Sequence, residues 1–138
     1  MKLKYKIYPE KRLLVEIISG TFNFIELKNL FEKLSKDKQF MEFDKVLTNV
    51  TEAKFKISIF EVDEYIKLVK NITKDREVKW SIITSKPKAT ALSMLITLDP
   101  FFRKSTKVFS TLEACVDFLN IDFEKENLLE NDYKIIDF

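Results

Sequence analysis

The sequence contains no histidine and only one glycine among its 138 residues. Histidine activates the nucleophile in Ser-His-Asp and Cys-His catalytic groups and is a principal ligand of zinc and haem, so almost all sites of these kinds are excluded. With Gly20 alone, no glycine-rich loop can bring backbone amides close to a phosphate chain. We therefore expect no catalytic residues, no metal site and no cofactor.

Cysteine and long apolar runs are also scarce. Cys115 is the only cysteine, so no internal disulfide can form, which favours a reducing compartment. The N-terminus alternates lysines with apolar residues and lacks the apolar run of a signal peptide. No stretch reaches the ~18 consecutive apolar residues that a membrane span needs. The sequence thus predicts a cytoplasmic protein with no membrane span.

The residues that are present describe one soluble domain with an unusual C-terminus. Apolar residues make up 46% and charged residues 33%, as in globular proteins. Residues 121–138, called the tail below, carry six acids and two lysines, so their net charge is −4 and the other 120 residues must sum to +6. This distribution favours a tail that packs on the basic body (residues 1–120) over binding to nucleic acid.

Large apolar side chains lie among the acids of the tail: Phe123, Leu128, Leu129, Tyr133, Ile135, Ile136 and Phe138. This is too much apolar surface for a disordered segment. We expect the tail to pack on its own domain or on a dimer mate, and Ile135, Ile136 and Phe138 offer a strand that could add to a sheet edge.

Strand and helix signals alternate along residues 1–120. The expected strands cover residues 2–7, 13–19, 45–50, 78–83 and 106–109, and the expected helices begin at Asn23, Ser58, about Pro87 and Ser110. Three of these helix starts carry a capping box, namely Asn23 with Glu26, Ser58 with Glu61 and Ser110 with Glu113. The helix that begins at about Pro87 ends near Asp99–Pro100, because proline cannot continue it.

This order, β-β-α-β-α-β-α-β-α, predicts an α/β fold with a five-stranded mixed sheet, in which an antiparallel hairpin precedes parallel strands with crossover helices. We expect the strand at residues 45–50 in the middle of the sheet and the first strand at its edge. Lys2, Lys4 and Lys6 would then protect that edge from other chains.

Three stretches of the sequence support a family resemblance. They are Tyr5-Lys6-Ile7-Tyr8-Pro9 leading into Leu14-Val15-Glu16-Ile17, Lys79-Trp80-Ser81-Ile82-Ile83-Thr84 leading into Lys86-Pro87-Lys88-Ala89-Thr90-Ala91, and Lys107-Val108-Phe109-Ser110-Thr111-Leu112-Glu113-Ala114. Together with the element order they resemble the STAS-like domains, whose best-known members are bacterial anti-sigma-factor antagonists. More narrowly, the chain is similar to small bacterial STAS-like proteins grouped with lipid-binding CRAL-TRIO domains. The resemblance covers about residues 3–120 and contains no catalytic motif.

The resemblance names Ser58 as a phospho-switch candidate. In the antagonists a serine at this helix start is phosphorylated within a motif that reads Asp-Ser, a small residue, then glycine. Here the same place reads Ile57-Ser58-Ile59-Phe60, so the acid and the glycine are missing. An N-cap role accounts for Ser58 without any switch.

The loop from Thr84 to Thr90 is the expected ligand site, because ligands of parallel sheets gather beyond the carboxyl ends of strands and anions favour helix N-termini. Thr84, Ser85, Lys86, Lys88 and Thr90 are the candidate anion-binding residues. Two solvated lysines beside a proline are the simpler interpretation. Trp80 and Cys115 are expected in the core, where Cys115 acts as a small hydrophobe.

Two functions follow from these observations. The first is a non-enzymatic STAS-like module that binds a protein partner or a second copy of itself. The second is a carrier of a small hydrophobic or lipid-like ligand, with Lys86 and Lys88 on its anionic headgroup. An enzyme comes third, because no residues form a catalytic group.

Overall fold

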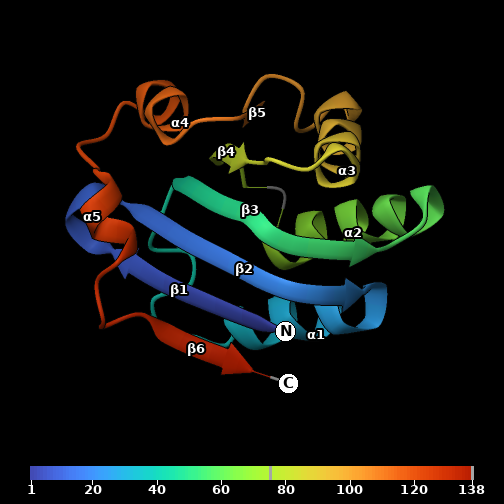
Figure 1. Ribbon diagram of the computed structural model, residues 1–138, viewed down its shortest axis with the longest axis horizontal. Coiled ribbons are helices and arrows are strands. Elements are labelled where there is room, and N and C mark those ends of the chain that lie inside the picture. The colour runs from blue at the N-terminus through green and yellow to red at the C-terminus, as the bar shows by residue number, and fades with distance from the viewer. Residues whose placement is uncertain (75, 138) are drawn as a thin grey trace.

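The computed structural model describes residues 1–74 and 76–137. Within these residues one sheet runs in the order β5-β4-β3-β2-β1-β6 (Figure 1). Its strands are β1 (Lys2–Tyr8), β2 (Leu13–Asn23), β3 (Lys45–Lys56), β4 (Lys79–Ile83), β5 (Thr106–Phe109) and β6 (Lys134–Asp137). The helices are α1 (Phe24–Leu34), α2 (Ile59–Ile72), α3 (Pro87–Leu98), α4 (Leu112–Leu119) and α5 (Lys125–Leu128), with a 3-10 turn at η1 (Pro9–Lys11).

Strand pairing confirms the mixed α/β sheet. β1 and β2 are antiparallel across the η1 turn, and β2, β3, β4 and β5 run parallel. β3 lies in the interior of the sheet, as predicted. In this register Glu16 of β2 pairs with Tyr5 on one side and with Thr48 on the other, so these three side chains form a row across the sheet.

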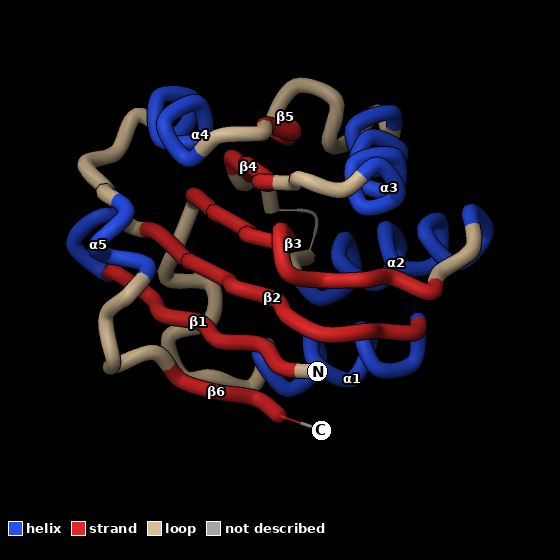
Figure 2. The backbone as a smooth tube through the Cα atoms, in the orientation of Figure 1, coloured by secondary structure: helices blue, strands red, loops and turns tan. Residues whose placement is uncertain are grey.

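The number of strands was predicted wrongly, because the tail supplies a sixth. β6 pairs antiparallel with β1, with Leu3 opposite Ile136 (Figure 2). The first strand is therefore not an edge, and edge protection does not explain its lysines. Lys6 instead lies 2.7 Å from the Asp132 carboxylate and 3.5 Å from that of Glu130, so this lysine holds the tail against the body.

The tail buries apolar side chains on its own chain. Phe123 and Tyr133 are buried, and the Phe123 ring meets that of Tyr8 edge to face. The Tyr8 hydroxyl also donates a 2.6 Å hydrogen bond to Glu130. Further along, Lys134 lies 2.7 Å from the Asp37 carboxylate. Phe138, one of the apolar residues expected to pack, lies outside the described residues.

Two apolar layers sandwich the sheet. Helices α1, α2 and α3 cover one face, and α4 with residues 121–133 of the tail covers the other (Figure 1). Alternation along β2 feeds both layers, because Leu14 and Ile18 point to the first while Leu13 and Val15 point to the second. A strand buried on both faces is typical of parallel sheets, and it explains the nearly continuous apolar run in this part of the sequence.

Two strands are longer than predicted. β3 continues past residue 50 to Lys56, and β2 continues past residue 19 to Asn23. Gly20, expected to end the strand, lies within β2 at a φ of 93°. A side chain there would also bring its Cβ to 2.7 Å from the Met1 Cα, so glycine suits the position on both counts.

Helix starts follow the capping signals with one exception. The capping boxes of Asn23 with Glu26 and of Ser58 with Glu61 are both formed, and α3 begins at Pro87 and ends before Asp99 as predicted. The prediction of Ser110 as a cap is wrong. Thr111 has the extended backbone of an N-cap and its hydroxyl accepts a 3.2 Å hydrogen bond from the Ala114 amide, so α4 begins one residue later.

Candidate functional site

The threonines of the predicted anion site bond to their own loop. The Thr84 and Thr90 hydroxyls lie 2.7 Å apart, and the Thr90 hydroxyl donates a 2.9 Å hydrogen bond to the Lys86 carbonyl. Ser85 donates to the Thr51 carbonyl at 3.4 Å. The structure thus brings Thr84 and Thr90 together, in a network that braces the start of α3.

Four of the five predicted site residues, Thr84, Ser85, Lys86 and Thr90, line one open hollow, whereas Lys88 lies on a neighbouring surface that Lys86 also borders. Lys86 and Lys88 line a groove with Lys54 and Lys56 from the end of β3, and we call these four residues the basic groove. Within residues 1–74 and 76–137 none of the four forms an ion pair. The groove was missed in part because β3 was expected to end at residue 50. Alternation of buried Ala53 with exposed Lys54 and Lys56 was the signal for the longer strand.

Next to the groove lies a cluster of exposed apolar side chains, Ile25, Ile59 and Phe60, which we call the apolar tip. Their exposed fractions are 66%, 65% and 80%. The ends of β2 and β3 run side by side, with Asn23 opposite Lys56, so α1 and α2 start next to each other beyond the two arrowheads (Figure 1). The apolar tip and the basic groove together form the docking surface discussed below.

Acids near the tip are engaged by their own helices. The Glu26 carboxylate accepts a 3.1 Å hydrogen bond from the Asn23 amide, and the Glu61 carboxylate accepts one of 2.9 Å from the Ser58 amide. These bonds direct both carboxylates back onto the backbone at the helix starts. Both carboxylates keep their charge, so the four lysines of the docking surface outnumber the two capping acids beside it.

Ser58 lies beside the tip and acts as the N-cap of α2. Its hydroxyl accepts a 3.2 Å hydrogen bond from the Glu61 amide, and the side chain is exposed. We expect Ser58→Ala to lower the free energy of unfolding by ~0.5–2 kcal/mol, the usual cost of a lost cap, in denaturant titrations. Ser110→Ala, at an exposed serine that caps no helix, is the matched control and should change stability little. Equal stability of the Ser58 and Ser110 variants would show that Ser58 does not act as a cap and would favour the phosphorylation hypothesis.

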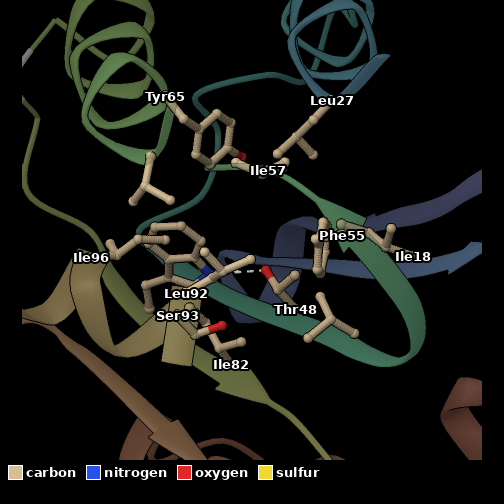
Figure 3. A pocket seen from close by; sticks show the side chains of 13 residues that line it. Ile18, Leu27, Thr48, Phe55, Ile57, Tyr65, Ile82, Leu92, Ser93 and Ile96 are labelled. Carbon is tan, nitrogen blue, oxygen red and sulfur yellow. Dashed lines mark hydrogen bonds between the residues drawn. The ribbon is translucent and has the colours of Figure 1, made fainter. Parts of the chain in front are cut away.

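A second candidate site lies under α2, between the helices and the sheet. Three small hollow spaces of about 70, 40 and 10 Å³ all have Tyr65 in their walls, and we call them together the Tyr65 cavity. Figure 3 shows the largest of them, with Tyr65 on one side and Thr48, Ile82 and Leu92 on the other. Its walls are almost entirely apolar.

A chain of hydrogen bonds crosses the sheet beneath this cavity. The Trp80 indole N–H donates to the Thr48 hydroxyl at 2.9 Å, the dashed line in Figure 3. The Thr48 hydroxyl then donates to Glu16 Oε1 at 2.7 Å. Trp80 is buried, as predicted, but its indole N–H also has this polar role. Because each donor faces an acceptor, the chain fixes the orientation of the Glu16 carboxyl.

Glu16 is a buried acid within an apolar strand, with an exposed fraction of 9%. Burial raises the pKa of its carboxyl to about 7, although the hydrogen bond from Thr48 acts in the opposite direction. Burial and the nearby Glu16 charge also raise the pKa of Tyr65, so the Tyr65 hydroxyl keeps its proton and remains a donor. The sequence held a signal for this site, because Glu16 is the single charge in the run from Leu13 to Ile18.

Cys115 lies on the buried face of α4 and is fully buried, as predicted. Burial raises the pKa of its thiol to about 11, although the neighbouring Ser81 side chain acts in the opposite direction. The thiolate that a nucleophilic cysteine requires is therefore disfavoured at neutral pH.

Metal-binding clusters and membrane-spanning helices are both absent from residues 1–74 and 76–137. No group of three histidine, cysteine, aspartate or glutamate side chains is placed to hold a metal ion. None of the helices in these ranges combines the length and the apolar character that a membrane crossing requires.

Comparison with known proteins gives a structural likeness at low sequence identity. No protein-family model and no curated protein sequence matches this chain. Among solved structures, the chain is similar to a crystal structure described as an uncharacterised protein from the DUF3478 family with a SpoIIAA-like fold, from Shewanella loihica. The two share 18% sequence identity over 78% of this chain and 83% of the other, with a TM-score of 0.48. Because that protein is uncharacterised, the likeness brings no ligand or partner to this chain.

Proposed function

We propose that this protein is a non-enzymatic interaction module that binds an acidic protein partner through the docking surface. The exposed apolar tip is the observation on which the proposal rests. Ile25, Ile59 and Phe60 are all more than three-fifths exposed and lie on two adjacent helix starts. Clustered exposed apolar side chains, with polar residues around them, typically mark an interaction site.

Charge supports an acidic partner. The basic groove adjoins the tip through the chain itself, since Lys56 ends β3 and Ile59 begins α2. In a typical interface a buried aromatic side chain supplies much of the affinity, while charges at the rim speed association and select the partner. Phe60 fits the first role, and the four lysines fit the second.

Chemistry supports a role without catalysis. The chain has no histidine, and its one thiol is buried with a raised pKa. A single cysteine also suits the reducing conditions of the cytoplasm, where we place the protein. A regulatory module of the STAS-like type needs only a surface that a partner recognises.

The proposal is tested with protein purified from its own host and measured by native mass spectrometry. Wild type should carry a protein partner in fixed stoichiometry. Ile59→Ser with Phe60→Ser should abolish that complex, and Lys54→Glu with Lys56→Glu should weaken it at least about tenfold because the charge complementarity is reversed. A matched control, Leu129→Ser with Ile135→Ser, removes exposed apolar side chains from the tail and should leave binding unchanged.

Three results would contradict the proposal. The tip variant could retain the partner, the complex could consist of two copies of this chain, or the tip could bind vesicles of anionic lipid and no protein. Each result assigns the docking surface to a different occupant or to none. The control variant ensures that a loss of binding is specific to the tip.

A second candidate function, a carrier of a small apolar ligand, is favoured by the Tyr65 cavity. The Phe55 ring borders both the largest space of this cavity and the basic groove. An apolar chain in the cavity could therefore end in an anionic group near Lys86 and Lys88. A small ligand that co-purifies with the protein from its own host, detected by native mass spectrometry, would support this function.

A further inference from the structure

The Glu16 carboxyl has one oxygen that the protein does not satisfy. Oε1 accepts the hydrogen bond from Thr48, but no donor in residues 1–74 or 76–137 reaches Oε2. The side chain is more than nine-tenths buried and lines the two smaller spaces of the Tyr65 cavity. This oxygen therefore borders the hollow space and is open to a donor that enters it.

Tyr65 is the second polar group at this place. Its hydroxyl makes no hydrogen bond within the described part of the chain, and its ring lines all three spaces. An acceptor at Glu16 and a hydroxyl at Tyr65 therefore border the same cavity. Both atoms are available to a molecule that enters it.

Apolar walls define the rest of the cavity. Its largest space lies against Val50, Ile82, Leu92 and Ile96. The largest space, about 70 Å³, has about half the volume of an engineered apolar cavity of about 150 Å³ that binds benzene, and the two spaces beside Glu16 measure about 40 and 10 Å³. An occupant of this shape has a small apolar body and one polar end.

We propose that the Tyr65 cavity binds a small apolar molecule with one hydrogen-bond donor, a hydroxyl or an amine on a ring or short chain, which donates to Glu16 Oε2. At pH 8, where the two probes are compared, the Glu16 carboxyl is ionised, and its free oxygen therefore selects for a donor, because an acceptor or an anion placed there would face a second acceptor. This inference rests on the carrier function and specifies the end of the ligand that lies deepest in the protein.

The test compares two probes of nearly equal shape, phenol and toluene, which differ in a hydroxyl and a methyl group. Trp80 is the only tryptophan in the chain and its indole N–H belongs to the chain of hydrogen bonds, so the indole resonance in ¹H–¹⁵N spectra reports on binding directly. In a wholly apolar cavity phenol should bind about tenfold more weakly than toluene, because its hydroxyl loses hydrogen bonds to water. We expect wild type to bind phenol at least as tightly as toluene.

Two variants assign the effect. Glu16→Leu removes the acceptor and should reverse the preference, so that toluene binds about tenfold more tightly than phenol. Ser93→Leu places a larger side chain in the wall of the largest space and should weaken both probes. If Glu16→Leu does not fold, the phenol-to-toluene ratio of the wild type alone decides the question.

The outcomes separate this inference from the carrier function. If wild type binds toluene tenfold more tightly than phenol, the cavity takes apolar ligands but the role of Glu16 is wrong. If neither probe shifts the Trp80 resonance, the cavity holds at most water and both the inference and the carrier function fail. Phenol binding that persists unchanged in Glu16→Leu would also overturn the assignment.

Discussion

Deletion of residues 121–138 is expected to lower the melting temperature by about 10 °C or more. Phe123 and Tyr133 are buried against the body, and each large apolar side chain that is fully buried contributes ~1.5–3 kcal/mol. For a domain of this size, 1 kcal/mol corresponds to roughly 3–5 °C in melting temperature. Deletion also removes β6 and leaves β1 as an open edge, so we expect the truncated protein to associate or aggregate.

A charge variant separates packing from electrostatics. Glu130→Gln with Asp132→Asn removes the ion pairs to Lys6 but keeps the apolar side chains of the tail. Exposed ion pairs contribute little, so this variant should shift the melting temperature by only a few degrees, and added salt should have a similarly small effect on wild type. A truncated protein as stable and as soluble as the full chain would show that the tail is a free segment that awaits a partner.

Stability is expected to fall as the pH rises from 5 to 8, because of Glu16. Its pKa is about 7 in the folded protein and 4.5 as the ordinary value, so folding favours the protonated carboxyl. The stabilisation that the protonated Glu16 carboxyl gives the folded state is complete below pH 4.5. It is lost as the pH rises through 7. The shift corresponds to about 3 kcal/mol, and denaturant titrations at several pH values measure it.

Glu16→Gln should remove this pH dependence and be more stable than wild type at pH 8. Glu52→Gln, at an exposed glutamate of the neighbouring strand, is the matched control and should keep the slope of wild type. Asp37 changes the stability in the opposite direction and at lower pH, because it stabilises the folded protein only while it is ionised. Burial opposes its ionisation, but hydrogen bonds from Lys134 and Tyr5 lower its pKa to about 2, so its contribution is lost only as the pH falls through about 2. Identical, flat profiles of wild type and Glu16→Gln would contradict the account of Glu16.

Local signals were sufficient for most of the fold. Side chains at Asn23 and Ser58 cap the helices that they were predicted to cap, and Pro87 begins α3. These contacts span only a few residues, so the sequence contains all the information that determines them. Ser110 failed as a cap because its neighbour Thr111 offers the same chemistry one position later. A shift of one residue lies beyond what a capping pattern resolves.

The tail could be predicted only in part. Its apolar residues indicated burial, but the choice between an edge strand, a dimer mate and a free segment depends on contacts across more than 100 positions, such as Lys6 with Asp132. The alternation of Lys2, Lys4 and Lys6 with apolar residues is compatible with all three arrangements of the tail, so it does not choose between them. Only the three-dimensional arrangement shows that these lysines lie beside a further strand rather than at an open edge.

The candidate sites were harder to predict because hydroxyl groups have several uses. Thr84 and Thr90 suggested a ligand loop, yet they bond to each other. Conversely, nothing in the residue pattern singled out Tyr65, and in the structure it lines a cavity beside Glu16. Residue type and spacing do not tell whether a polar group meets its own chain or a ligand.

The central claim, that the apolar tip binds a protein, is tested most directly by the mass of the complex that the protein carries out of its own host cells. The account predicts one protein partner in fixed stoichiometry on wild type and on the Leu129→Ser, Ile135→Ser control. The same measurement on Ile59→Ser with Phe60→Ser should show the bare chain at 16.4 kDa less the change in side-chain mass. A partner that remains on the tip variant, or a wild type that leaves the cell with no protein bound, would contradict it.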